Sequence, residues 1–145
     1  MLVKKKFIEK ISDLSNIEFK NISKKNNSPF MSYEFLDAIE TSGSASPSSG
    51  WRPYHMTTFK NEALNGFMPL YLKNNSQGEF LFDHQWSYAL QRANRKYYPK
   101  FLSAIPFTPC ETSKLVAPDM DTASEMIETV KEEMTKLNIE TWHVL

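Results

Sequence analysis

A chain of 145 residues is long enough for one domain with a substantial hydrophobic core. Its 17 basic and 17 acidic residues balance, which excludes a strong overall field for nucleic acid or an acidic membrane. The single cysteine, Cys110, excludes an internal disulfide and a cysteine metal cluster, and we expect no metal site. No apolar run has the length of a signal peptide or a membrane span, so we expect a cytoplasmic protein.

The N-terminal part of the chain predicts a strand followed by a helix. Residues 4–11 alternate loosely, as in a strand, and Ser32 has the position of a helix N-cap. The expected apolar face of that helix holds Phe35, Leu36 and Ile39, and its expected solvent face holds Glu34, Asp37 and Glu40. The Ser-, Gly- and Pro-rich segment 42–50 reads as a surface loop, with a mobile flap over a ligand as the alternative.

The middle of the chain predicts a three-stranded meander and a second helix. Residues 54–60 and 64–73 read as two strands of a hairpin, and Pro69 in the second points to an edge, a bulge or a strand end. After a turn, residues 79–83 form a short third expected strand. Helical spacing of the apolar residues in 84–94 then predicts a helix that begins just after Asp83-His84.

The C-terminal part predicts one long helix between two strands. Residues 101–105 read as a strand or a packed loop, and residues 139–145 start a new strand. In the helix between them, Thr122 and Glu125 have capping-box spacing, and Asp121 is an alternative cap. The expected apolar stripe is Ala123, Met126, Ile127, Val130, Met134 and Leu137; the expected ion pair is Glu132 with Lys136, and the expected end is Asn138.

The order of these elements is that of an α+β domain. Because the chain stops inside its last predicted strand, we expect residues 1–145 to be one part of a longer protein.

Asp83 and His84 are the candidate catalytic residues, because they lie where a predicted strand meets a predicted helix. Unpaired N–H groups at a helix start favour an anion there. Asp83 could serve as a general base or orient His84, and His84 could transfer a proton near neutral pH. The alternatives are that Asp83 only caps the helix and that His84 is structural.

A cluster of cations and aromatic residues follows, and it suits phosphate, nucleotide or RNA ends through ion pairing and stacking. Its members are Arg92, Arg95, Lys96, Tyr97, Tyr98 and Lys100, with Trp86 on the preceding helix. A solvated helix end with two core tyrosines is the alternative. Trp51 and His55, which flank the predicted hairpin, are weaker candidates for substrate binding.

The usual catalytic signatures are missing from the chain, which has no HExxH, GxSxG, Walker or CxxC motif. The predicted strand–helix junction also lacks the glycine-rich turn that cradles a pyrophosphate. This weighs against tight binding of coenzyme A by this part of the protein.

Several longer motifs nevertheless resemble a known bacterial family. In chain order they are Asn27-x-Pro29-Phe30, Ser42-Gly43-Ser44, Gly50-Trp51-x-Pro53-x-His55, Pro69-Leu70-Tyr71-Leu72-Lys73, Ser76-x-Gly78-Glu79-Phe80-x-Phe82-Asp83-His84-x-Trp86, Ala89, Arg92, Tyr97-Tyr98-Pro99-Lys100 and Ala104-x-Pro106-Phe107-Thr108-Pro109. The family consists of predicted N-acyltransferases, also described as peptidoglycan biosynthesis/recognition proteins. It is similar to the FemAB-like branch of the GNAT acyltransferase superfamily.

The resemblance implies a GNAT-like fold with a mixed, mainly antiparallel sheet and flanking helices, in which residues 1–145 form an incomplete N-terminal lobe. It implies transfer of an acyl or aminoacyl group to an amine, with acyl-CoA or aminoacyl-tRNA as donor. The implied partners are a small-molecule or cell-wall precursor substrate, tRNA and a missing C-terminal lobe. A non-catalytic module that binds a cell-wall precursor or RNA, and a fragment that is inactive alone, remain open alternatives.

Overall fold

The computed structural model describes residues 2–145, which form four α-helices, three short 3-10 helices and seven strands. The α-helices are α1 (Asn16–Ile22), α2 (Tyr33–Thr41), α3 (His84–Arg92) and α4 (Met120–Leu137). The strands are β1 (Val3–Ile8), β2 (Arg52–Pro53), β3 (His55–Lys60), β4 (Ala63–Met68), β5 (Tyr71–Lys73), β6 (Lys100–Ser103) and β7 (Trp142–Val144). The 3-10 helices are η1 (Ile11–Asp13), η2 (Pro29–Met31) and η3 (Pro47–Ser49).

The strands form two mainly antiparallel sheets, with orders β1-β3-β4 and β2-β5-β6-β7 over the described residues. The pair β6–β7 is parallel. Together with the flanking helices, these sheets confirm the predicted α+β class and are consistent with a GNAT-like arrangement. In residues 2–145, none of the helices is both long and apolar enough to cross a membrane.

The predicted hairpin is present, and its second strand is divided in two. Asn61 and Glu62 have φ of 50° and 68°, as a tight two-residue turn between β3 and β4 requires. Strand β4 ends just before Pro69, which has no N–H for a ladder, and β5 begins in the other sheet. The Tyr54 N–H donates to Leu70 O at 2.8 Å, so the two sheets remain connected at this break.

The third predicted strand, residues 79–83, is absent in the described chain, so that prediction is wrong. Phe80 has a positive φ of 57°, which an extended strand cannot contain. The segment instead folds as a loop that returns across β5 and β6.

The boundaries of α2, α3 and α4 are largely as predicted, whereas α1 was not predicted, and α4 has a different cap. Asp119 Oδ1, rather than Thr122 or Asp121, accepts a hydrogen bond at 2.7 Å, and its donor is the Thr122 N–H. Asn138 ends the helix in the left-handed conformation, as predicted. The expected pair of Lys136 with Glu132 is wrong, because the Lys136 ammonium lies 3.7 Å from Glu133 instead.

The cap of α2 is confirmed, but one residue on its expected solvent face is wrongly placed. Ser32 Oγ accepts a hydrogen bond from the Phe35 N–H at 3.2 Å. Glu40 does not face water: its carboxylate reaches His55 Nε2 at 2.7 Å and the Ile11 N–H at 2.8 Å. This contact ties α2 and η1 to the sheet that contains β3.

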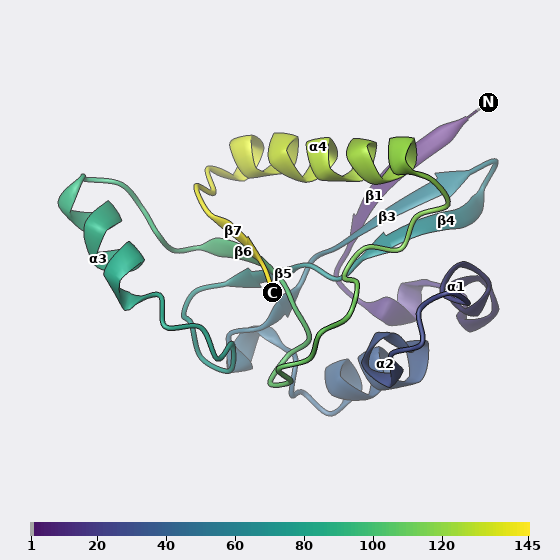
Figure 1. Ribbon diagram of the computed structural model, residues 1–145, viewed down its shortest axis with the longest axis horizontal. Helices are drawn as coiled ribbons and strands as arrows, with labels where there is room; N and C mark the ends of the chain where they lie inside the picture. The colour runs from purple at the N-terminus through teal and green to yellow at the C-terminus, as the bar shows by residue number, and fades with distance from the viewer. Residues whose placement is uncertain (1) are drawn as a thin grey trace.

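Helices cover both faces of the first sheet, as Figure 1 shows, with α4 on one side and α1 and α2 on the other. A hydrophobic core lies on each face of this sheet, and successive residues of β4 point into different cores. Phe67 packs with α1 and α2, and Met68 packs with α4. Gly66 allows the close approach of α4, because a Cβ there would lie 2.8 Å from Met126 Sδ.

In the second sheet, the same alternation separates the face beneath α4 from a face that carries charged side chains beside the apolar residues Tyr71 and Leu102. Phe101 and Trp142 belong to the core beneath α4. The neighbouring residues Lys100 and His143 therefore point to the opposite face, which the loop after β5 covers. The candidate site lies on this second face.

Candidate functional site

Four charged side chains form a buried ionic cluster between the second sheet and the loop that covers it. The cluster consists of Lys73 from β5, Lys100 from β6, and Glu79 and Asp83 from the loop. All four side chains are fully buried from solvent. Two cations balance two carboxylates, as burial of charge requires.

Lys100 holds the centre of the cluster. Its Nζ donates to Glu79 Oε2 at 2.7 Å, to Asp83 Oδ2 at 2.7 Å and to Ser76 Oγ at 2.9 Å. An ammonium group has three protons, so these three bonds use its entire donor capacity. Lys100 therefore links both carboxylates to the turn that follows β5.

Lys73 is held differently, against an aromatic ring. Its Nζ donates to Gln77 O at 2.9 Å, lies 3.5 Å from Glu79 Oε1 and sits 3.8 Å from the ring centroid of Trp51. Burial lowers the pKa of Lys73 to about 8, although the Glu79 carboxylate acts in the opposite direction. Lys73 is thus the member of the cluster whose charge changes within a mildly alkaline range.

Asp83 is an ionised acceptor in this structure. Burial would raise its pKa, but hydrogen bonds from Lys100, Ser76 and Tyr97 outweigh burial and lower the pKa well below its ordinary range. Asp83 occupies the N-cap position of α3, yet its side chain makes no capping hydrogen bond. A carboxylate with so low a pKa is a weak general base and a strong orienting group.

A hydrogen-bond chain leads from Asp83 to His143, and we name it the Asp83–Tyr97–His143 relay. The Tyr97 hydroxyl donates to Asp83 Oδ2 at 2.5 Å, and His143 Nε2 lies 3.0 Å from the same hydroxyl oxygen. Because the tyrosine has one proton and gives it to an ionised carboxylate, its oxygen must accept from His143. The relay therefore requires the tautomer of His143 with the proton on Nε2.

This tautomer leaves His143 Nδ1 with a free lone pair. Among residues 2–145, Nδ1 has no hydrogen-bond partner, and the side chain is only partly buried. Burial, and then the positive charge of Lys100, lower the pKa of His143 below its ordinary value. His143 is therefore neutral at physiological pH and able to accept a proton.

The hydroxyl of Tyr97 cannot provide this proton-accepting function itself. Burial, and then its hydrogen bond to Asp83, raise the pKa of Tyr97 well above its ordinary range. Tyr97 stays protonated. Its hydroxyl, held by the Asp83 carboxylate, fixes the orientation of the His143 ring.

Two carboxylate oxygens of the cluster retain unused acceptor capacity. Within residues 2–145, Glu79 Oε1 and Asp83 Oδ1 are buried and make no hydrogen bond. An unsatisfied buried acceptor is costly, by about 1–3 kcal/mol. The cluster therefore depends strongly on its two lysines.

Of the residues predicted from the sequence, four meet in this site. Asp83, Tyr97 and Lys100 are in direct contact, and the Tyr98 hydroxyl lies 2.5 Å from Ser76 Oγ. Trp51 contributes indirectly: it stacks beneath the Lys73 ammonium and donates its Nε1–H to Gln77 O at 3.1 Å.

The other predicted residues lie elsewhere. His84, Trp86 and Arg92 are exposed on α3, and Arg95 is exposed and paired with Glu140 at 2.8 Å. His55 is buried: its Nδ1 accepts the Leu70 N–H at 3.2 Å, and its Nε2 contacts Glu40. This pair holds the first sheet to α2 and does not contact the cluster.

The sequence analysis missed four members of the site, namely Lys73, Ser76, Glu79 and His143. The sequence did contain one indication for His143. It lies between Trp142 and Val144 in a predicted strand, where successive side chains point to opposite faces, so His143 must face away from these two apolar residues. Lys73 and Glu79 looked like ordinary charges flanking a turn.

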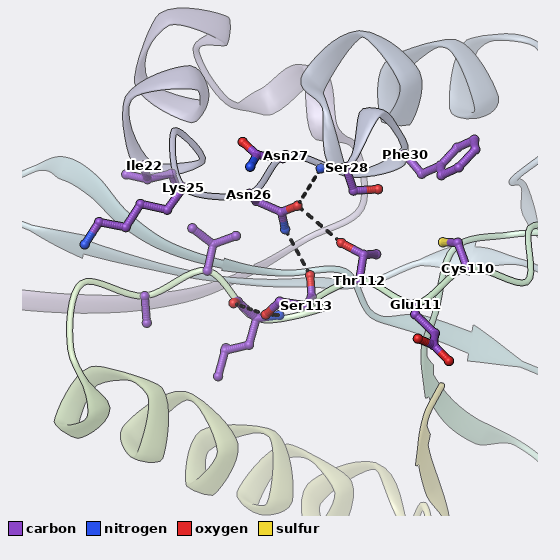
Figure 2. A pocket seen from close by; sticks show the side chains of 13 residues that line it. Ile22, Lys25, Asn26, Asn27, Ser28, Phe30, Cys110, Glu111, Thr112 and Ser113 are labelled. Atoms are coloured by element: carbon purple, nitrogen blue, oxygen red, sulfur yellow. Dashed lines mark hydrogen bonds between the residues drawn. The ribbon is translucent and has the colours of Figure 1, made fainter.

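Cavities lie to the side of this site. Figure 2 shows one of about 560 Å³ between residues 22–30 and 110–117. There the Asn26 side chain accepts from Thr112 Oγ1 at 3.2 Å and donates to Ser113 O at 3.1 Å. Glu79 itself lines a second cavity of about 380 Å³, together with Leu145 at the end of the segment that carries His143.

The described residues offer no metal centre: across 2–145, no group of three or more His, Cys, Asp or Glu is arranged to hold an ion.

A comparison with protein families matches residues 10–145 to the FemAB-like family, described as peptidoglycan biosynthesis/recognition. The chain belongs to the FemAB-like family. The match covers the whole ionic cluster, the relay and every described strand except β1, and it confirms the resemblance seen in the sequence motifs. A comparison with curated proteins gave no match.

Proposed function

We propose that this FemAB-like protein is an N-acyltransferase that transfers an acyl or aminoacyl group to an amine in peptidoglycan metabolism. The observation that carries the proposal is the Asp83–Tyr97–His143 relay, which leaves a neutral imidazole with a free nitrogen at the edge of a buried ionic cluster. The family description supplies the metabolic context.

In this reaction, the amine nitrogen attacks the carbonyl carbon of a thioester or ester, and the donor's thiol or hydroxyl leaves. The new amide bond forms only if the amine loses a proton. His143 Nδ1 accepts that proton, and the relay stabilises the resulting imidazolium through Tyr97 and the Asp83 carboxylate. Asp83 is thus an orienting group in this proposal, and His84, which is exposed on α3, has no role in proton transfer.

The donor is an acyl-CoA or an aminoacyl-tRNA, both of which carry phosphates. Arg92 and Lys96 are exposed cations near the end of α3 and are available for phosphate contacts. Helix α3 begins at His84, with Asp83 at the N-cap, and no glycine-rich turn precedes it. We therefore do not expect the N-terminus of α3 to bind a pyrophosphate group.

A non-catalytic module that recognises a cell-wall precursor is the second candidate. The observation in its favour is that the charges of the cluster satisfy one another, with Lys100 saturated by three partners. Such a cluster can serve to fix the covering loop without taking part in chemistry.

Product formation separates these two functions. The purified protein would be incubated with acyl-CoA or aminoacyl-tRNA and an amine-bearing peptidoglycan stem peptide, with mass spectrometry of the peptide as the readout. We expect a peptide heavier by one acyl or aminoacyl group. Peptide binding by calorimetry without any mass change would reject the transferase and support the binding module.

A further inference from the structure

The cavity beside the ionic cluster holds a buried lysine that has no acidic partner among residues 2–145. We name this cavity, of about 380 Å³, the Lys114 cavity, and its walls include Glu79, Ile105, Cys110, Glu111, Lys114 and Leu145. Lys114 is only 7% exposed. The ion pairs of residues 2–145 do not include it. A buried cation of this kind is rare, because burial of a charge is costly unless the charge is paired.

Lys114 also has hydrogen-bonding capacity that the described chain does not use. Its Nζ donates to Cys110 O at 2.9 Å, which is its one hydrogen bond within residues 2–145. An ammonium group has three protons, so two of them remain free. Lys100, by contrast, gives all three protons to protein acceptors. The unused protons of Lys114 indicate an anionic group that the described residues do not supply.

The position of Cys110 shows which cavity the ammonium faces. Lys114 also borders a cavity of about 530 Å³ that Ile127 of α4 and Trp142 of β7 line. Cys110 O, the acceptor of the Lys114 proton, belongs to a residue that lines the Lys114 cavity and, in the described chain, not this larger one. The ammonium is therefore held at the wall of the Lys114 cavity.

The Lys114 cavity lies on the same face of the second sheet as His143. One of its walls is Glu79, whose carboxylate accepts from Lys100 at 2.7 Å. Another is Leu145, whose N–H donates to Ser103 O at 3.0 Å, so the pairing of β7 with β6 continues to this residue. Side chains two residues apart in a strand point to the same face and lie about 7 Å apart. A small molecule of extended shape can therefore contact both this cavity and His143.

We propose that the Lys114 cavity binds the carboxylate of a ligand that carries both an amine and a carboxylate. The carboxylate accepts the two free protons of Lys114. Its identity as the acceptor substrate rests on the proposed function: the amine then reaches His143 Nδ1 while the carboxylate stays at Lys114. The inference thus names a substrate class, an amine with a carboxylate several bonds away, and a residue that selects it.

A phosphate suits the same cavity less well than a carboxylate. Glu79 and Glu111 also line it, and Glu111 is exposed without an ion pair to Lys114. A phosphate group carries a charge of about −1.5 to −2 at neutral pH, which one lysine cannot balance beside two carboxylates. The single charge of a carboxylate matches the single charge of Lys114.

A matched pair of small probes tests the proposal on the unchanged protein. The protein would be titrated with 6-aminohexanoate, with 6-aminohexanamide, which has the same amine but no carboxylate, and with inorganic phosphate, followed by nitrogen-15 NMR. We expect 6-aminohexanoate to shift the amide signals of Ile105, Lys114 and Leu145. It should bind at least about tenfold more tightly than either other probe, because only it makes the charged hydrogen bonds to Lys114.

Two substitutions of Lys114 and one matched control locate the effect. Lys114→Gln keeps a donor for Cys110 O and should lose the preference for 6-aminohexanoate, whereas Lys114→Arg, which keeps the charge, should retain it. The control is Lys25→Gln, which removes an exposed lysine from the neighbouring cavity of Figure 2 and should bind like the unchanged protein. Equal affinity of the unchanged protein for the two amines, tighter binding of phosphate, or a preference that persists in Lys114→Gln would overturn the proposal.

Mass spectrometry of the same two amines after incubation with a donor separates this inference from the proposed function. Acylation of 6-aminohexanoate at a KM at least about tenfold lower than that of the amide would support both. Acylation of both amines with equal KM would overturn the carboxylate subsite and leave the transferase intact. Carboxylate-dependent binding without acylation of either amine would reject the transferase and leave the subsite.

Discussion

Replacing Lys100 with methionine is expected to destabilise the fold by about 3–5 kcal/mol, a large part of the stability of a domain of this size. The substitution keeps an unbranched side chain only one heavy atom shorter and removes the ammonium that both Glu79 and Asp83 contact at 2.7 Å. The two carboxylates would then remain buried with only Lys73 nearby. Urea denaturation followed by circular dichroism measures the loss.

The matched control is Lys96→Met, which removes an exposed lysine four residues away and should change the stability by less than about 1 kcal/mol. Equal stabilities of Lys100→Met and Lys96→Met would contradict the role given to Lys100.

The effect of Lys100→Met should also depend on pH. In the unchanged protein the pKa of Asp83 is lowered, so its contribution is present above the ordinary aspartate pKa and is lost as pH falls through the lowered value. Without Lys100 that pKa rises, so protonation then relieves the buried charge. The stability difference between the two proteins should therefore shrink as the pH is lowered.

Replacing His143 with glutamine is expected to reduce the proposed transfer rate by about 10²–10⁴-fold, the usual contribution of a general base. Glutamine retains a hydrogen-bond donor for Tyr97, which limits structural change, but it cannot accept the proton of the amine. The comparison variant is His84→Gln, which alters an exposed histidine on α3 and should leave the rate unchanged. Full activity of His143→Gln, or its loss in His84→Gln, would contradict the assignment.

The pH profile of the rate gives a second readout. Because the pKa of His143 is lowered, the neutral base is present at neutral pH and becomes protonated only below the ordinary histidine value of about 6.5. We expect a rate that is flat near neutral pH and falls on the acid side. In His143→Gln this acid limb should disappear.

Local patterns were sufficient to predict much of this fold. The cap at Ser32, the hairpin turn at residues 61–62 and the end of α4 at Asn138 each follow from a short-range rule, and each is present. The cap of α4, Asp119, lies two residues before Asp121, the nearer of the two predicted caps. Positions of caps are among the least certain features of a helix in sequence.

The site could be predicted only in part, because long-range contacts assemble it. Tyr97 and Lys100 were recognised from their mixture of charge and aromatic character, but their partners come from other segments. Lys100 contacts Glu79 across 21 positions of the chain, and Tyr97 contacts His143 across 46. Pairing of β6 with β7 brings His143 to the relay, and no local pattern specifies that pairing.

The wrong expectations have a common physical cause. Glu40 looks solvent-exposed in a helical pattern, and residues 79–83 look like a strand in an alternating one. In the structure, the Glu40 carboxylate is hydrogen-bonded to the His55 ring. Residues 79–83 form a bent loop that places Glu79 and Asp83 beside Lys73 and Lys100. A buried hydrogen bond at Glu40 and buried ion pairs at Glu79 and Asp83 override local propensity.

The most direct test of this account is the tautomer and pKa of His143, measured by nitrogen-15 NMR over a pH titration. The relay predicts a neutral ring with its proton on Nε2 and a pKa below the ordinary histidine value. In Tyr97→Phe, which removes the hydroxyl between Asp83 and the ring, the preference for this tautomer should weaken. A proton on Nδ1 at neutral pH, or a pKa at or above about 6.5, would contradict the proposed base.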